Sequence, residues 1–444
     1  MQNELDSLFA GHLAAIRRRT DDALAAHDFD GLAVFSGCAT NAFLDDHAYP
    51  FRANPHFKLW VPLSDAPHSF LAYAPGSRPR LCFHQPSDYW HKPPEVPTGE
   101  WLGEFELEIL REPGAARPLL GTGERRVAYI GEWQPQFADW GFAAVNPPAL
   151  LRELHYSRAV KTAYEIECLR QASRIAARGH QAARDAFYAG ASEFEVHLAY
   201  CAATELREEE LPYGNIVAFD EGAAVLHYQH LDRRRGRSRR SFLIDAGAQV
   251  RGYASDITRT YSAAADEFAA LVAAMDGLQQ RLCNSIRKGT DYREVHLEAH
   301  HRIADLLHEA GLIACDADTA VSSGVSSVFF PHGIGHLLGL QVHDVAGLAR
   351  NAAGDEIPRP PGHPYLRLTR TLEPGFVVTV EPGLYFIDLL LDATRADARG
   401  RLIRWDAVER FRPYGGIRVE DDVVCTGGAP ENLTRDAFAA IARA

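Results

Sequence analysis

A chain of 444 residues is too long for one ordinary hydrophobic core, so two or more domains are expected. Its 46% hydrophobic and 24% charged residues are typical of a soluble globular protein, and the net charge of −13 argues against a nucleic-acid partner. No apolar run reaches the length of a membrane span. The acidic start of the chain and seven cysteines without a CxxC pair favour a cytoplasmic protein with reduced thiols.

Residues 1–158 are predicted to form a small α/β domain. Apolar residues at helical spacing, from Leu5 to Ile16, predict an amphipathic helix at its start. Apolar runs between polar or Pro/Gly breaks predict strands at 31–37, 68–74, 80–84 and 126–132.

Residues 159–444 are predicted to form a second, mixed domain with helices over an antiparallel sheet. Two helices begin with capping boxes, Thr162 with Glu165 and Ser192 with Glu195. The next two helices are expected at 266–289 and 291–311, each ending at a glycine, and the rest mostly as strands and loops. We interpret the arginine-rich run 233–240 as a solvated loop, because the acidic balance of the chain disfavours nucleic acid.

Residues 241–262 are predicted to form two strands joined by a glycine-containing turn, and each strand carries an aspartate in apolar surroundings. Asp245 follows Phe242-Leu243-Ile244, and Asp256 precedes Ile257 eleven residues later. Because an ionised carboxylate is costly to bury alone, something positive is expected between the two.

Three later stretches repeat this feature. The segment 329–347 contains the three histidines His332, His336 and His343, but Gly333 and Gly335 argue against a helical HxxxH zinc site. Glu381 ends a β-branched run. Glu420 lies in another predicted strand, on the same face as Arg418 by two-residue alternation.

Five of these residues form a candidate metal site, because their strands hold no comparable set of arginines or lysines to neutralise them. Taken singly, each could be a structural residue with a satisfied partner; together, four carboxylates and one imidazole need cations. An oxygen-rich set without a thiolate suits Mn²⁺ first, then Co²⁺ or Zn²⁺. The candidate ligands are Asp245, Asp256, His336, Glu381 and Glu420.

These motifs resemble the metal-dependent pita-bread peptidases, which include methionine aminopeptidase, aminopeptidase P and prolidase. The resemblance covers nearly the whole chain and is strongest to the bacterial prolidases, with "FLDDHAYPF", "FLIDAG", "YASDITRTY", "FFPHGIGH", "GLQVHDVAG" and "PYGGIRVEDDVV" as its main motifs. It implies a pita-bread catalytic domain and hydrolysis of Xaa-Pro dipeptides by a hydroxide that bridges two divalent ions. It also implies side activity on organophosphorus esters.

The resemblance assigns roles to single residues. Asp256 and Glu420 bridge the two metals, Asp245 completes one, and His336 with Glu381 completes the other, Glu381 also moving protons. His343 and His227 resemble the substrate histidines of the family, and His332 is the weaker case; a structural role stays open for all three. Arg418 pairs either with the substrate carboxylate, which the family favours, or with a metal-ligand carboxylate.

The resemblance further implies a homodimer, in which a first-domain loop closes the partner's pocket. Asp45 and Trp90 are the loop candidates, and Tyr213 is expected nearby in the pocket. An aminopeptidase P-like enzyme, which takes longer peptides, is the nearest alternative. A non-catalytic pita-bread module and a metal-independent creatinase-like hydrolase are both disfavoured by the complete ligand set.

Overall fold

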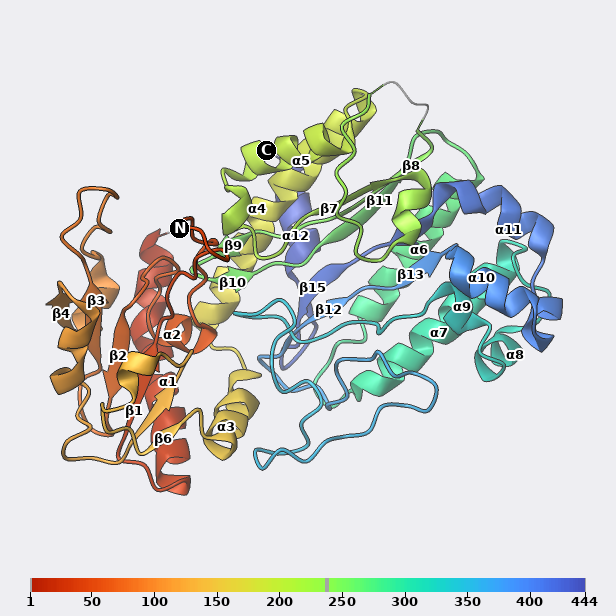
Figure 1. The fold of residues 1–444 in the computed structure, drawn as a ribbon. Helices are drawn as coiled ribbons and strands as arrows, with labels where there is room; N and C mark the ends of the chain where they lie inside the picture. Colours follow the sequence, from red (N-terminus) through yellow and green to blue (C-terminus); the bar gives the residue numbers. More distant parts are fainter. Residues whose placement is uncertain (1, 236–238, 444) are drawn as a thin grey trace. The chain divides into compact units, whose positions relative to one another are not determined.

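The computed structural model describes residues 2–235 and 239–443, which form two compact units (Figure 1). The first unit comprises Met1–Cys168 with the short segments Arg251–Tyr253 and Asn351–Asp355, and the second comprises the remainder. The change of unit falls inside a helix, and the boundary expected after residue 158 stays a prediction. Residues 236–238 of the predicted arginine-rich loop lie outside the described residues. None of the described helices is both long and apolar enough to cross a membrane.

The first unit is built on a six-stranded mixed sheet with the order β4-β3-β2-β1-β5-β6. Its strands are β1 (Gly31–Phe35), β2 (Phe70–Tyr73), β3 (Arg80–His84), β4 (Glu106–Leu110), β5 (Val127–Ile130) and β6 (Ala144–Val145). Its helices before the change of unit are α1 (Gln2–Ala26), α2 (Pro55–Trp60) and α3 (Pro148–Arg158). The four predicted strands are confirmed, whereas the edge strands β4 and β6 were not predicted.

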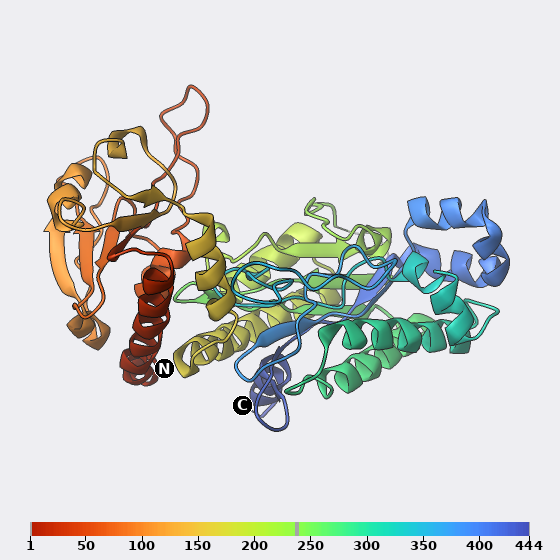
Figure 2. The same cartoon turned by 90° about the horizontal axis from the view of Figure 1, so that it is seen from below.

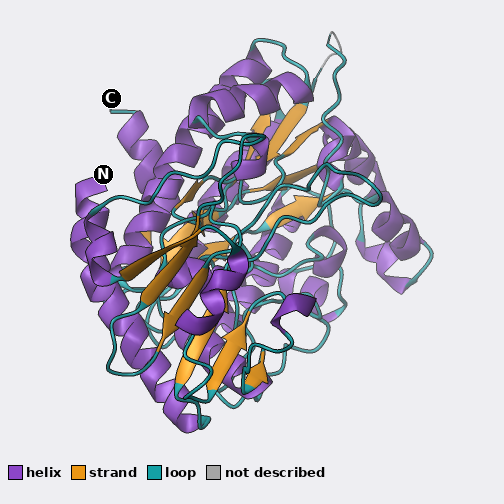
Figure 3. Cartoon of the chain, turned by 60° about the vertical axis from the view of Figure 1, so that its left-hand side comes forward, coloured by secondary structure: helices purple, strands orange, loops and turns teal. Residues whose placement is uncertain are grey.

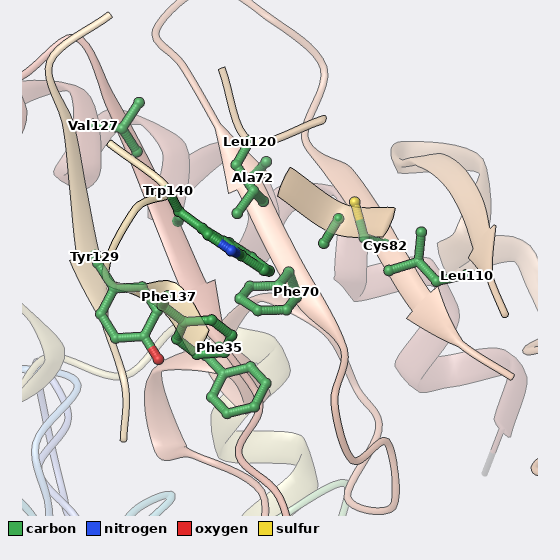
Figure 4. Packing of buried hydrophobic residues seen from close by; sticks show 12 residues of the cluster. Phe35, Phe70, Ala72, Cys82, Leu110, Leu120, Val127, Tyr129, Phe137 and Trp140 are labelled. Atoms are coloured by element: carbon green, nitrogen blue, oxygen red, sulfur yellow. The ribbon is translucent and has the colours of Figure 1, made fainter. Parts of the chain in front are cut away.

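The core of this unit is aromatic (Figure 4). Phe35 and Phe70 come from neighbouring antiparallel strands, and their ring centroids lie 4.8 Å apart. Phe137 meets the ring of Phe35 edge-on, and the ring of Trp140 lies 4.6 Å from that of Phe137. Such tilted contacts are the favoured aromatic geometry.

The second unit holds several small antiparallel sheets with helices packed against them (Figure 3). Its strands are β7 (Ile216–Phe219), β8 (Ser241–Asp245), β9 (Gln249–Val250), β11 (Thr258–Ser262), β12 (Val377–Val380), β13 (Gly383–Tyr385), β14 (Gly416–Arg418), β15 (Asp421–Val424) and β16 (Glu431–Asn432), and β9 pairs with β10 (Tyr253–Ala254). Its helices are α5 (Glu193–Thr204), α6 (Glu267–Cys283), α7 (Tyr292–Glu309), α8 (Ala317–Ser322), α9 (Ser326–Phe329), α10 (Asp388–Arg395), α11 (Trp405–Phe411) and α12 (Leu433–Ile441), and α4 (Ala163–Tyr188) enters it from the first unit.

Helices cover this framework as the sequence predicts. Both capping boxes are present: the amide of Thr162 donates to Glu165 at 2.8 Å, and Ser192 with Glu195 caps α5. Aromatic side chains of α4 and of β7 and β8 form a shared core. Helices α6 and α7 run side by side (Figure 2). After residue 311 the described chain is mostly strands and loops, as expected, but it also contains the short helices α8 to α12, which were not predicted.

The observed strands differ from the predicted ones at two of the candidate ligands. Strands β8 and β11 pair as the predicted hairpin, with Asp245 opposite Thr258, but Asp256 lies before β11 rather than inside it. Glu420 lies in the break between β14 and β15 instead of within one strand. Its amide donates to the carbonyl of Thr258 at 3.0 Å, so a single bridge joins this break to the hairpin.

Candidate metal centre

The five predicted metal ligands come together in the second unit. Asp245 is the last residue of β8, and Glu381 directly follows β12. His336 precedes Leu337, which forms an isolated bridge with Val378 of β12. All five line one cavity of about 600 Å³.

His336 connects two of the carboxylates. Its Nε2 lies 3.4 Å from Oδ2 of Asp256 and 3.6 Å from Oε1 of Glu381. Its Nδ1 donates to the carbonyl of Leu337 at 3.0 Å, because a carbonyl can only accept. This bond fixes the ring so that Nε2 faces the carboxylates, as is usual for a metal-binding imidazole.

Ligand atoms of Asp256, His336 and Glu420 lie within 4.8 Å of one another. Glu420 is held by the hydroxyl of Thr258, which donates to Oε2 at 2.7 Å. All three residues are buried.

Tyr213 and Arg418 support the other end of the cluster. The hydroxyl of Tyr213 lies 2.8 Å from Oδ1 of Asp245 and 2.6 Å from Oδ1 of Asp256, and its single proton serves one carboxylate at a time. The guanidinium of Arg418 donates to Oδ2 of Asp245 at 2.7 Å and lies 4.0 Å from Glu420. Tyr213 does not line the cavity, although it was expected in the pocket.

The carboxylates repel one another electrostatically, and the charge of Arg418 alone does not neutralise them. Burial, with the charges of Asp256 and Glu381, raises the pKa of Glu420 well above its usual range. Burial likewise raises the pKa of Glu381 to about 7 despite the opposing charge of His336. The pKa of Asp245 is also raised by burial, in spite of Arg418. Divalent cations would reverse these shifts, and the oxygen-rich donor set suits them.

Three further histidines surround the cluster. The ring of His343 stands edge-on to that of His336 at 4.4 Å, and burial lowers its pKa to about 4. His332 is placed 3.6 Å from Glu381 and 2.8 Å from the hydroxyl of Tyr385, and burial lowers its pKa to about 3. His227 also lines the cavity.

The cavity has lining residues that sequence reasoning missed. Arg359, Tyr365 and Arg367 come from an irregular loop, where no periodicity marks them. No carboxylate of the described residues forms an ion pair with Arg367. Asp45 and Trp90, in contrast, are exposed residues of the first unit, Trp90 to 78%, and neither lines this cavity.

A largely buried set of four carboxylates and one imidazole around a cavity, in a mixed α/β fold, defines a metal-dependent hydrolase. Residues 167–427 match the family described as metallopeptidase family M24, and residues 7–156 match the Xaa-Pro dipeptidase N-terminal domain. The chain belongs to metallopeptidase family M24, and its second unit contains the pita-bread catalytic domain of that family.

Two kinds of relative are similar to this chain. An Xaa-Pro dipeptidase of Xanthomonas campestris pv. campestris is 52% identical over 440 residues, and one of Stenotrophomonas maltophilia is 51% identical over 441, with 99% of each chain covered. Among solved structures, Pseudomonas aeruginosa aminopeptidase PepP has a TM-score of 0.71 at 23% identity, covering 97% of this chain and 99% of its own. Proline aminopeptidase P II from Yersinia pestis has a TM-score of 0.70 at 24% identity, covering 97% and 100%. These structures show the shared fold alone.

Proposed function

We propose that this protein is a metal-dependent dipeptidase that cleaves Xaa-Pro dipeptides. The observation that carries the proposal is the cluster of buried Asp245, Asp256, His336 and Glu420 with partly buried Glu381, beside a cavity large enough for a small peptide. Identity of 52% to an Xaa-Pro dipeptidase over 99% of both chains supports this substrate class.

The five ligands would hold two divalent ions, with Mn²⁺ the first choice and Co²⁺ or Zn²⁺ the alternatives. Asp256 and Glu420 are proposed to bridge them, because Asp256 contacts His336 and shares the hydroxyl of Tyr213 with Asp245, and Glu420 has a ligand atom within 4.8 Å of those of Asp256 and His336. When bound, the ions supply an activated water and polarise the scissile carbonyl.

The remaining roles belong to side chains of this chain. Glu381 would take a proton from the attacking water and pass it to the departing proline nitrogen. His343 has a lowered pKa and is therefore neutral, so it has one N–H to donate to the developing oxyanion. His332 has a lowered pKa and is neutral too, but its Nδ1–H donates to the carbonyl of Gly333, so we propose that it acts by holding the hydroxyl of Tyr385 through Nε2. His227 is proposed to contact one end of the dipeptide.

The geometry supports different roles for two arginines, one orienting a metal ligand and the other binding the substrate. Arg418 already engages Asp245 and the hydroxyl of Tyr385, which favours an orienting role over the substrate contact that the family resemblance suggested. Arg367 lines the same cavity and is not paired with a carboxylate, so we assign it the C-terminal carboxylate of the dipeptide. Tyr213 would orient Asp245 and Asp256 from behind.

The alternative of an aminopeptidase P-like enzyme has less support, because the two aminopeptidase P structures compared above are 23% and 24% identical and share only the fold. A non-catalytic module is disfavoured by the complete ligand set.

We propose a homodimer in which a first-domain loop closes the partner's pocket. Four large apolar residues in two loops are between 78% and 91% exposed in the single chain, and exposed apolar surface of this kind favours a protein contact; they are Phe43, Leu44, Tyr89 and Trp90. Asp45, in the same loop as Phe43 and Leu44, would reach the partner's site. We also keep a domain boundary between residues 158 and 159 and a cytoplasmic location as parts of the proposal.

Metal analysis tests this function. The purified protein is stripped with a chelator, reloaded with Mn²⁺, Co²⁺ or Zn²⁺, and assayed on Ala-Pro. Turnover that returns as two ions per chain are bound supports the proposal, and a stripped protein that hydrolyses Ala-Pro at the full rate contradicts it.

A further inference from the structure

Three histidines gather in the second unit, apart from the cavity-lining residues. His296 and His300 lie one turn apart on α7, and His363 comes from the irregular segment after Glu356. The ring centroids lie 4.7 Å apart for His296 and His300, 4.6 Å for His296 and His363, and 4.5 Å for His300 and His363. One nitrogen of each lies within 4.8 Å of the others.

The hydrogen bonds of this cluster are incomplete. Nε2 of His296 lies 2.9 Å from Nδ1 of His363, and Nδ1 of His300 lies 3.0 Å from the hydroxyl of Ser326. Nδ1 of His296 and Nε2 of His300 are buried and have no partner. The unsatisfied Nε2 of His300 is unusual, because buried polar atoms are nearly always satisfied, and it indicates a missing ligand. For His296 the nitrogen that faces the cluster is Nε2, which contacts His363, so its unsatisfied Nδ1 is not part of the argument.

The three imidazoles are in the charge state that metals bind. Burial, helped by the neighbouring histidines, lowers the pKa of His296 to about 2 and that of His300 to about 3. Burial also lowers the pKa of His363. All three are therefore neutral near pH 7 and offer lone pairs without first losing a proton.

We propose that His296, His300 and His363 form a second metal site, for a borderline divalent ion such as Zn²⁺. Nitrogen-only coordination suits Zn²⁺ and disfavours Mn²⁺, so this site would select differently from the oxygen-rich cluster. Tetrahedral zinc with bonds of about 2.0–2.1 Å places two nitrogens roughly 3.3 Å apart. The observed 2.9 Å between His296 and His363 requires only a small opening, and half-buried His363 gives access to a water as the fourth ligand.

A metal ion at this site would hold the segment that lines the catalytic cavity. Pro364 and Tyr365 follow His363 directly and line the catalytic cavity, as does Arg367. Zinc bound here would tie this segment to α7. The ring of Phe330 lies 4.9 Å from His300 and 4.7 Å from the cavity residue His332, so an apolar side chain lies between the two centres.

Zinc counting on the full-length protein tests the proposal. The wild type, His300→Gln, His363→Gln and the control His301→Gln are saturated with ZnCl₂, desalted and analysed for zinc by mass spectrometry. His301 is the next residue on α7 and pairs with Asp318 instead of joining the cluster, so its replacement controls for loss of an imidazole.

We expect the wild type and His301→Gln to hold one more zinc ion per chain than His300→Gln and His363→Gln. Equal zinc content in all four proteins overturns the proposal. If His300→Gln fails to fold, the zinc content of His363→Gln decides, because His363 is half-buried in an irregular segment and its replacement disturbs the fold less. Turnover of Ala-Pro by the Mn²⁺-loaded variants is read separately, so failure of the dipeptidase proposal leaves the zinc count interpretable.

Discussion

The guanidinium of Arg418 lies 2.7 Å from Oδ2 of Asp245, and both side chains are buried. Arg418 also donates to Thr258, whose hydroxyl donates to Glu420. One arginine thus orders two of the proposed metal ligands, Asp245 directly and Glu420 through Thr258. This arrangement favours a role for Arg418 in orienting the metal ligands over a role in binding the substrate.

Replacing Arg418 with lysine is therefore expected to lower metal content. Lysine keeps the charge but lacks the planar fork that reaches Asp245 and Thr258 together. We expect metal affinity to fall roughly 10–100-fold, as on loss of other groups that orient ligands, and kcat to fall alike for Ala-Pro and its C-terminal amide. Unchanged metal content, with a defect confined to Ala-Pro, would return Arg418 to the substrate role.

Arg367→Gln should show the opposite pattern. If Arg367 holds the substrate carboxylate, losing that charge-assisted contact of about 1.5–3 kcal/mol raises KM for Ala-Pro roughly 10–100-fold. Metal content should stay at the wild-type value. The amidated dipeptide, which has no carboxylate, serves as the control and should be processed equally by the variant and the wild type. An equal KM defect for both substrates would remove Arg367 from this role.

Asp256→Asn should lose more metal than Asp245→Asn. Asp256 is proposed to bridge both ions, whereas Asp245 completes only one, so the first change affects two sites and the second affects one. The hydroxyl of Tyr213 contacts both aspartates. Tyr213→Phe therefore serves as the control, because it removes these hydrogen bonds and leaves both carboxylates in place. Metal content is measured after dialysis. If both aspartate variants keep all of their metal, Asp256 is not a bridging ligand.

The metal-free protein should lose stability as the pH rises from about 4.5 to about 7. Burial raises the pKa of Glu381 from 4.5 to about 7, so folding favours its protonated form. That stabilisation is complete below the unfolded pKa and disappears as the pH passes the folded pKa. Thermal unfolding at several pH values should show a weaker decline in Glu381→Gln and in the metal-loaded protein. An identical decline in all three would exclude Glu381 as its source.

Regular elements could be predicted from the sequence because their signals are local. The capping box of Thr162 with Glu165 and the buried face of α1, with Leu5, Phe9 and Ile16, follow from side-chain spacing alone. The candidate ligands could be found for a similar reason, since a carboxylate inside or next to an apolar strand is conspicuous wherever it occurs.

What the sequence did not reveal depends on contacts between distant segments. The break at Glu420 arises from its bridge to Thr258, about 160 residues away, and no local pattern marks it. Arg367 lies in an irregular loop without periodicity. His296 and His300 lie within the helix predicted at 291–311, and their spacing of four residues was a usable signal, but only the fold brings His363 to them.

Comparison of Ala-Pro with Ala-Pro-Ala tests the central claim most directly. The metal-loaded protein is assayed on both peptides under identical conditions, with Asp256→Asn as the metal-site control. We predict ready hydrolysis of Ala-Pro and almost none of Ala-Pro-Ala, because the carboxylate of a dipeptide reaches Arg367 whereas a third residue moves it away. Comparable turnover of the two peptides would contradict the dipeptidase assignment and favour an aminopeptidase P-like enzyme.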